Sequence, residues 1–230
     1  MRKTFSINPF LFLYTALILC TSLFSQEFDT DLMFYPTDQK KGLIPEFDDS
    51  YGVLFRDING SGGPEIYSVR FRNLNRYFVN SKQGKAFKEK TIQTGLGGNL
   101  EPRQLDNLEL GAASADIDND GFEDIMIIGW GSTTRIFHQS SKKVFTDITE
   151  ESGLPLPISG NGATFADIDL DGDLDVFITD EHDKNHLLIQ TKINGFEDRT
   201  DAFGLSGKGI SQTATFADLN GDNFPELYVC

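Results

Sequence analysis

Short apolar runs alternate with polar turn residues along most of the chain, and this pattern indicates β-strands. Runs rich in β-branched residues span 125–128, 176–178 and 227–229, and each follows an acidic segment. Glycine and asparagine, as at Asn194-Gly195, separate such runs. Strand-length runs bounded by turn residues are typical of antiparallel hairpins. From residue 26 onward, no stretch of useful length shows sustained helical periodicity. The pattern therefore predicts an all-β fold.

One unit of this pattern recurs four times, each time around an acidic segment of nine residues. These segments are loop 1 (57–65), loop 2 (116–124), loop 3 (167–175) and loop 4 (218–226), and their first residues lie 59, 51 and 51 positions apart. Each unit is expected to form strand, acidic loop, strand, turn, strand, turn and strand. In the first three units an aromatic residue, a Thr and a Gly-Leu pair follow. They are Phe87, Thr91, Gly95 and Leu96; Phe145, Thr149, Gly153 and Leu154; and Phe196, Thr200, Gly204 and Leu205.

Four short antiparallel strands per unit of about 40–50 residues are typical of a β-propeller blade. A single four-stranded sheet cannot bury both faces, so neighbouring blades must stack face to face. The small residues at 111–113 and 162–163 suit an innermost strand, where blades crowd together. A β-solenoid and separate sandwiches are the alternatives.

The two ends of the repeat region bear on how many units the chain holds. Phe34 lies eight residues before Gly42-Leu43, which matches the spacing of an outermost strand, and the chain stops after the second strand of the fourth unit. We therefore expect about four repeat units over residues 26–230, as a fragment of a longer propeller.

The net charge of the chain restricts the classes of partner that it can bind. Asp and Glu number 35 against 20 Lys and Arg, and the formal net charge is −15. Such a surplus disfavours binding to nucleic acid or to anionic membrane surfaces, because both would repel the chain. It suits a protein that collects divalent cations.

The N-terminus is expected to be a secretory signal peptide, residues 1–25. Arg2 and Lys3 precede a charge-free, mostly apolar stretch that is short for a spanning helix. A retained anchor and a lipid anchor at Cys20 are alternatives, but Leu19 is too large for the usual lipobox. We expect a secreted or cell-surface protein, in the periplasm or on the outer surface if bacterial, without membrane insertion after cleavage. Cys230 would be the only thiol of the mature chain, so metal or a large core must stabilise it.

The acidic loops carry the candidate chemistry. Calcium takes six to eight oxygen ligands, and a tight loop can supply them from side chains at positions 1, 3, 5 and 9 and a backbone carbonyl at position 7. Gly121 and Gly172 stand at position 6, where the chain must turn sharply, and Asn223 tolerates the left-handed conformation there. The candidate ligands are Asp57, Asn59, Ser61, Gly63 and Glu65; Asp116, Asp118, Asp120, Phe122 and Asp124; Asp167, Asp169, Asp171, Asp173 and Asp175; and Asp218, Asn220, Asp222, Phe224 and Glu226.

The four loops are not equal. Loops 2 and 3 each offer four carboxylates, which would repel one another without a cation, whereas loop 1 offers two charged ligands and loop 4 three. The alternative is that these acidic segments bind no metal and are solvated turns of β-hairpins. An EF-hand is excluded, because position 12 is Ser68, Ile127, Ile178 or Val229 instead of Glu and the flanks are β-rich.

The segment from Phe165 to Val176, with a Phe-x-Asp-x-Thr and Gly-Leu segment nearby, resembles the FG-GAP/VCBS repeats of integrin α-subunits and many bacterial secreted proteins. The resemblance covers residues 34–230 and is closest to the cartilage-acidic-protein-like branch. It implies a seven-bladed propeller with calcium in hairpin loops, serving adhesion or surface recognition.

Two functional classes follow. The first is a non-catalytic scaffold for a protein or carbohydrate ligand, and the second is a secreted polysaccharide lyase or hydrolase, for which Arg70 and Tyr67 are candidate bases. We expect the scaffold, since no catalytic motif is present. His182 and His186 are expected to be turn histidines, although their spacing would also suit zinc. Trp130 is expected in a blade core or turn, with a sugar-binding surface as the alternative.

Overall fold

A computed structural model of the chain describes residues 50–81, 86–97, 108–132, 134–140, 144–154 and 158–230, all within a unit of residues 39–230. The expected signal peptide (1–25), the candidate lipid anchor Cys20 and the strand expected near Phe34 lie outside the described residues. Within the described part, no helix has the length and apolar character needed to cross a membrane.

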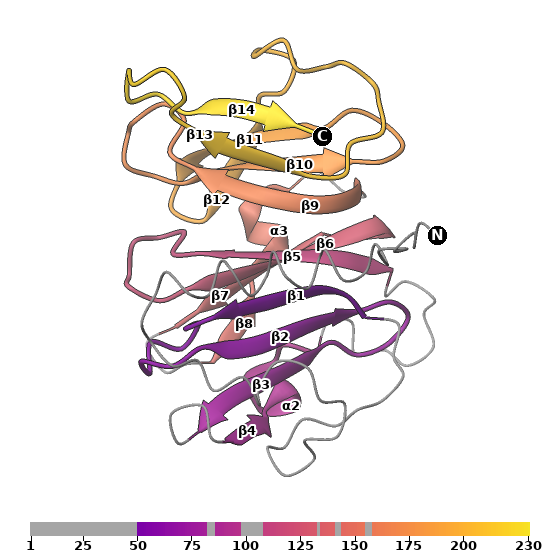
Figure 1. The fold of residues 1–230 in the computed structure, drawn as a ribbon, viewed down its shortest axis with the longest axis vertical. Coiled ribbons are helices and arrows are strands. Elements are labelled where there is room, and N and C mark those ends of the chain that lie inside the picture. Colours follow the sequence, from indigo (N-terminus) through magenta and orange to yellow (C-terminus); the bar gives the residue numbers. More distant parts are fainter. Residues whose placement is uncertain (1–49, 82–85, 98–107, 133, 141–143, 155–157) are drawn as a thin grey trace, which may run out of the picture. The chain divides into compact units, whose positions relative to one another are not determined.

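Three repeats form a four-stranded antiparallel meander, as the sequence predicts (Figure 1). A fourth contributes two paired strands. Repeat 1 comprises β1 (Ser50–Arg56), β2 (Glu65–Arg70), β3 (Arg76–Ser81) and β4 (Ala86–Glu89). Repeat 2 comprises β5 (Glu109–Ala115), β6 (Asp124–Ser132), β7 (Arg135–Gln139) and β8 (Phe145–Asp147). Repeat 3 comprises β9 (Ile158–Ala166), β10 (Asp175–Asp180), β11 (His186–Lys192) and β12 (Gly195–Asp198), and repeat 4 comprises β13 (Ala214–Ala217) and β14 (Glu226–Val229).

Consecutive repeats lie one upon the next in a curled, propeller-like array (Figure 1). The strand order runs β12-β11-β10-β9-β6-β7-β8, with β5 beside β6, because β9 pairs with the end of β6 at Trp130–Ser159 and Ser132–Ile158. The antiparallel meander within each repeat differs from the parallel coils of a β-solenoid. Shared cores between repeats also set the fold apart from separate sandwiches.

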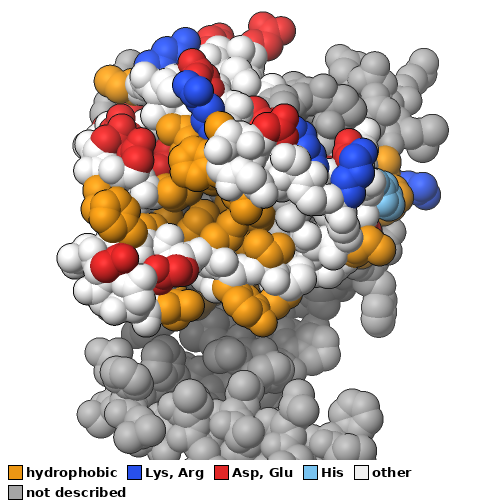
Figure 2. All heavy atoms as spheres, turned by 90° about the horizontal axis from the view of Figure 1, so that it is seen from above, with side chains coloured by type: hydrophobic (Ala, Val, Ile, Leu, Met, Phe, Trp, Pro, Cys, Tyr) orange, Lys and Arg blue, Asp and Glu red, His pale blue; other side chains and the backbone are white. Residues whose placement is uncertain are grey.

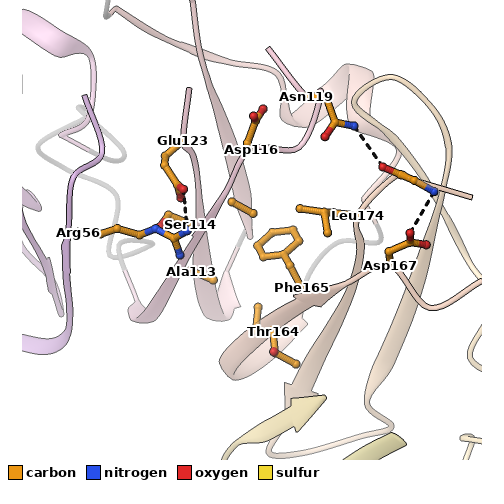
Figure 3. A pocket seen from close by; sticks show the side chains of 13 residues that line it. Arg56, Ala113, Ser114, Asp116, Asn119, Glu123, Thr164, Phe165, Asp167 and Leu174 are labelled. Atoms are coloured by element: carbon orange, nitrogen blue, oxygen red, sulfur yellow. Dashed lines mark hydrogen bonds and ion pairs between the residues drawn. The ribbon is translucent and has the colours of Figure 1, made fainter. Parts of the chain in front are cut away.

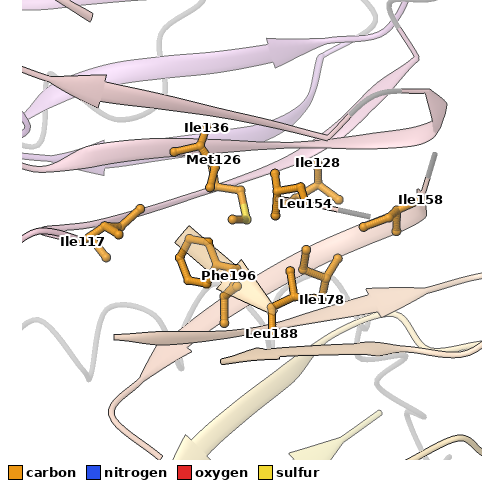
Figure 4. Packing of buried hydrophobic residues seen from close by; sticks show 11 residues of the cluster. Ile117, Met126, Ile128, Ile136, Leu154, Ile158, Ile178, Leu188 and Phe196 are labelled. Atoms are coloured by element: carbon orange, nitrogen blue, oxygen red, sulfur yellow. The ribbon is translucent and has the colours of Figure 1, made fainter. Parts of the chain in front are cut away.

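Each hydrophobic cluster is shared by two neighbouring repeats. Ile125 and Ile127 of β6 pack toward repeat 1, whereas Met126 and Ile128 of the same strand pack toward repeat 3. Figure 4 shows the cluster between repeats 2 and 3, to which β6 and β7 contribute from one repeat and β9 to β12 from the other. Because both faces of β6 are covered, its sequence is a continuous apolar run instead of an alternating one.

Repeat 4 packs on repeat 3 through a third cluster, which includes Phe177 and Phe216. The rings of these two residues meet edge to face at 6.3 Å. Leu219, Phe224 and Tyr228 of repeat 4 are each more than half exposed. Viewed from the β14 end, hydrophobic side chains gather at the centre of this face (Figure 2).

Two four-residue helices, α2 (Thr91–Thr94) and α3 (Thr149–Ser152), are features that the sequence pattern did not reveal. One turn is too short to show helical periodicity. The Thr and Gly-Leu motif builds them. The Thr149 hydroxyl accepts the backbone N–H of Ile136, and Gly153 ends the helix with a φ of 73°. Repeat 1 matches this arrangement with Thr91, Tyr77 and Gly95.

Candidate metal centre in the acidic loops

Every acidic loop joins the first and second strands of its repeat, and its first Asp closes it. The carboxylate at position 1 accepts the backbone N–H of position 6 in all four loops. The donor and acceptor pairs are Gly62 and Asp57 at 2.8 Å, Gly121 and Asp116 at 2.9 Å, Gly172 and Asp167 at 3.1 Å, and Asn223 and Asp218 at 3.0 Å. The first Asp therefore holds the loop backbone in shape even without a bound cation.

Two positions of each loop have left-handed backbone. The turn predicted at position 6 is confirmed, with φ of 89° at Gly121, 96° at Gly172 and 74° at Asn223. Position 4 is left-handed as well, and the sequence analysis missed it. Leu170 conceals this requirement, because its φ of 61° is unusual for a large side chain. The residues at position 4 that could have revealed it are Gly60, Asn119 and Gly221.

The acid at position 9 ties the loop to the third strand of the repeat. Asp124 accepts the backbone N–H of Ile117 at 3.1 Å and that of Gln139 at 2.7 Å. In repeat 3, Asp175 does the same with Ile168 and Gln190, at 3.0 and 2.9 Å. In repeat 1, Glu65 accepts from Asn59 and Asn80. Position 9 therefore has a bracing role besides its candidate role as a ligand.

Burial changes the protonation of these acids. Desolvation raises the pKa of Asp124 to about 6, and the backbone N–H donors and His138 oppose this only in part. Desolvation likewise raises the pKa of Asp175 and of Glu65. A buried carboxylate with a raised pKa gains from a nearby cation, which favours its charged form.

Carboxylates converge in loops 2 and 3. Among the described residues, Asp116, Asp118 and Asp120 place ligand oxygens within 4.8 Å of one another. Asp167, Asp169 and Asp171 do so in loop 3. Asp167 Oδ1 is also buried without a hydrogen-bond partner. A divalent cation would relieve both the repulsion and this unpaired oxygen, so these residues fit calcium.

Position 7 residues lie where the loops rejoin their strands. The backbone N–H of Phe122, Asp173 and Phe224 is donated to the position 5 carboxylate of the same loop, at 2.9, 2.9 and 2.8 Å. These hydrogen bonds hold the side chain at position 5 against the loop backbone. In loop 1, Gly63 lies beside the side chain of Asn80.

Loops 1 and 4 fit a cation less well. In loop 4, Asn220 Nδ2 donates to Asp222 Oδ2 at 3.1 Å and to Glu226 Oε1 at 2.6 Å, so an amide N–H lies between two candidate ligands. In loop 1, Asp57 and Glu65 are the only carboxylates and Ser61 is exposed, while the buried, unpartnered Asn59 Oδ1 is a neutral oxygen that cannot offset the charge of a cation. This difference supports the ranking of loops 2 and 3 above loops 1 and 4, which stays a prediction.

His138 is a site residue that the sequence analysis did not identify. Its Nδ1 lies 3.1 Å from Asp124 Oδ1 and 3.6 Å from Asp118 Oδ2. These three residues form another group whose ligand atoms lie within 4.8 Å of one another. His138 belongs to β7, and only the antiparallel pairing of β6 and β7 brings it to loop 2.

The other histidines and Trp130 lie elsewhere. Neither His182 nor His186 belongs to a potential metal group among the described residues. His182 is in a turn, as expected, and its ring lies 5.5 Å from that of Trp130. The expectation of a turn is wrong for His186, which begins β11 and contacts Asp198 at 3.0 Å. The half-buried Trp130 indole donates to Glu181 at 2.9 Å.

The bases considered for a lyase are core residues. Tyr67 has no exposed surface, and its hydroxyl donates to the Leu96 carbonyl at 3.1 Å. Burial raises its pKa well above the usual value. Arg70 is buried too, and its guanidinium donates to the Leu74 carbonyl. Neither side chain lies in an open cleft.

A cavity of about 660 Å³ lies beside loops 2 and 3 (Figure 3). The ring of Phe165 projects into it, between the Arg56–Glu123 ion pair and Asp167. Asn119 Nδ2 donates to the Gly172 carbonyl at 3.2 Å, which links the two loops. Asp116 of loop 2 and Asp167 of loop 3 therefore line the shared cavity as well as closing their own loops.

Comparison with known proteins adds one finding. A family model described as an FG-GAP-like repeat matches residues 116–178 and 167–229, so the two matches cover loops 2 and 3 and loops 3 and 4. No curated protein matches the chain. Together with the propeller-like meander and the acidic loops, these two matches support the assignment of the chain to the FG-GAP repeat family.

Proposed function

We propose that this chain is an exported or cell-surface repeat scaffold that binds calcium in loops 2 and 3 and serves adhesion or the recognition of a protein or carbohydrate ligand. The observation that carries the proposal is the convergence of three carboxylates in each of these loops, on a backbone that the first Asp already holds closed. Hard oxygen ligands in a tight loop are the donor set that calcium prefers. Asp116, Asp118 and Asp120 would hold it in loop 2, with the Phe122 carbonyl and Asp124.

The bonds around the loops suggest how calcium would brace the fold. In repeats 1 to 3, the acid at position 9 connects the loop to the third strand. In repeats 2 and 3, a glutamine of that third strand also contacts the loop of the preceding repeat. Gln139 Nε2 donates to the Ile58 carbonyl in loop 1 at 2.8 Å. A loop stiffened by a cation would therefore also restrain the repeat beside it.

We further propose a non-catalytic role. The candidate bases for a lyase, Tyr67 and Arg70, are buried in the core and engaged with backbone carbonyls. The finer placement in the cartilage-acidic-protein-like branch rests on the aromatic, Thr and Gly-Leu segment, which forms α2 and α3 in repeats 1 and 2.

Thermal denaturation of the full chain, in calcium and in chelator, tests the calcium part. Because a cation that binds only the folded state stabilises it by mass action, we expect calcium to add several kcal/mol to the free energy of unfolding. Asp169→Ala should remove one strong site in titration calorimetry. Ser61→Ala in loop 1 is the matched control and should hardly alter the stoichiometry. Identical melting temperatures in the two buffers would contradict the proposal.

A further inference from the structure

We propose that loop 2 also binds a first-row transition-metal dication, of the Zn²⁺ or Co²⁺ class, with His138 as its nitrogen ligand. The metal would exchange with calcium at this loop, whereas loop 3 remains an all-oxygen site. The inference rests on the proposed function in one respect, namely that loop 2 is a cation site.

The spacing of the three side chains fits joint ligation. His138 Nδ1 lies 3.1 Å from Asp124 Oδ1 and 3.6 Å from Asp118 Oδ2. Two ligand atoms about 2.1 Å from one ion lie roughly 3.0 Å apart at right angles and about 3.4 Å apart in a tetrahedron. The observed separations therefore need little adjustment.

Partial burial favours the same site. The side chains of Asp124, Asp118 and His138 are 0, 13 and 23 % exposed, so the group is mostly shielded from water but still reachable. Asp124 also accepts the backbone N–H of Ile117 and of Gln139, which fixes its orientation. Ligands held by such outer hydrogen bonds are typical of metal sites.

Among repeats 1 to 3, repeat 2 alone carries a histidine at this position of its third strand. The corresponding positions, 22 residues after the first Asp of the loop, are Val79 in repeat 1 and Ile189 in repeat 3. Both of these side chains pack in hydrophobic clusters. The fold itself therefore calls for an apolar residue at this place, and packing does not account for a histidine.

The chemistry of imidazole sets the metal class. Calcium prefers oxygen ligands, while a neutral imidazole nitrogen with two carboxylates suits Zn²⁺, Co²⁺ and similar ions. Among the described residues, the metal group of loop 3 contains carboxylates alone. The two loops should therefore differ in selectivity despite their almost identical acidic spacing.

The test is a titration of the full chain with CoCl₂ in excess calcium, followed by the visible absorption of Co²⁺. His138→Ile installs the residue that repeat 3 carries, and His138→Asn keeps a polar group that can hydrogen-bond to Asp124. We expect one tight Co²⁺ site in the unmodified chain and a loss of affinity of about tenfold or more in both variants. In ¹⁵N spectra of the unmodified chain, Zn²⁺ should shift His138 Nδ1.

Calcium serves as the internal control. The calcium-dependent melting shift should persist in both variants, and Asp169→Ala in loop 3 should leave the Co²⁺ site intact. Equal Co²⁺ binding in all three chains, with the calcium effect unchanged, would overturn the inference and leave the calcium scaffold standing. A chain that responds to neither cation would overturn both.

Discussion

Gln190 on β11 donates its side-chain Nε2 to the carbonyl oxygen of Ile117 in loop 2, over 3.1 Å. The same relationship holds one repeat earlier, where Gln139 donates to Ile58. Each glutamine also gives its backbone N–H to the position 9 acid of its own repeat, as Gln190 does to Asp175. One buried residue therefore connects the acidic loops of two neighbouring repeats.

Replacing this link should weaken the junction between repeats 2 and 3. Gln190→Leu keeps the backbone N–H but leaves the Ile117 carbonyl buried without its side-chain donor, which costs about 1–3 kcal/mol. Urea denaturation measures the loss. Gln93→Leu on exposed α2 is the control and should change stability by less than about 0.5 kcal/mol. If the two variants were equally stable, the glutamine link would have no energetic weight.

Without calcium, the chain should lose stability as the pH rises from about 4 through 6. Burial raises the pKa of Asp124 to about 6, whereas the unfolded chain releases this proton near pH 4. The folded state therefore binds more protons in this window, and its stability falls with rising pH, by roughly 3 kcal/mol at most. Denaturant titrations in chelator at several pH values measure the slope.

Asp124→Asn should flatten that slope, and it should lower stability at acidic pH, where one of the two backbone donors, Ile117 or Gln139, loses its acceptor. Calcium should reverse the trend in the unmodified chain, since the ligands must be ionised to bind it. The same slope in Asp124→Asn and the unmodified chain would show that another group is responsible.

Leu170 stores strain in loop 3 that a single substitution should release. Its φ is 61°, and the residue is 47 % exposed, so little packing compensates for the left-handed backbone. Asn119 holds the same place in loop 2 with a φ of 58°. Because asparagine tolerates this conformation, Leu170→Asn should stabilise the chain by about 0.5–1 kcal/mol in urea denaturation. Leu219→Asn, at an exposed residue without positive φ, should change stability little, and an equal gain there would point to solubility instead of strain.

Features that recur in every repeat could be predicted from the sequence. The strand order, the acidic loops and the turn at position 6 all appear several times at fixed spacing, so each copy supports the others. The left-handed backbone at Leu170 could not be predicted from the sequence, because a large residue is unusual in that conformation and conceals it. His138 and Gln190 act across strands or across repeats, and such contacts depend on sheet register and stacking, which spacing along the chain does not encode. Tyr67 and Arg70 were candidate bases by residue type alone, because the sequence does not reveal that both side chains are buried.

The Gly-Leu turns act as spacers between repeats, and two glycines with nearly the same backbone allow a test. Gly153 has a φ of 73° and Gly204 a φ of 74°, so an alanine at either place meets the same left-handed penalty of about 1 kcal/mol. A Cβ at Gly153 would lie 2.9 Å from the carbonyl oxygen of Phe196 in the next repeat. At Gly204 it would meet no atom within 4 Å.

Gly204→Ala should therefore cost about 1 kcal/mol, and Gly153→Ala should cost about 1–3 kcal/mol more, because the backbone of β12 cannot yield as a flexible side chain would. Urea denaturation of both variants under one calcium concentration gives the difference directly. Gly95→Ala, whose Cβ would lie 3.0 Å from the Phe145 carbonyl, should behave like Gly153→Ala. Equal losses in Gly153→Ala and Gly204→Ala would mean that the repeats separate without cost at this junction, and that the glycine is required for its backbone conformation alone.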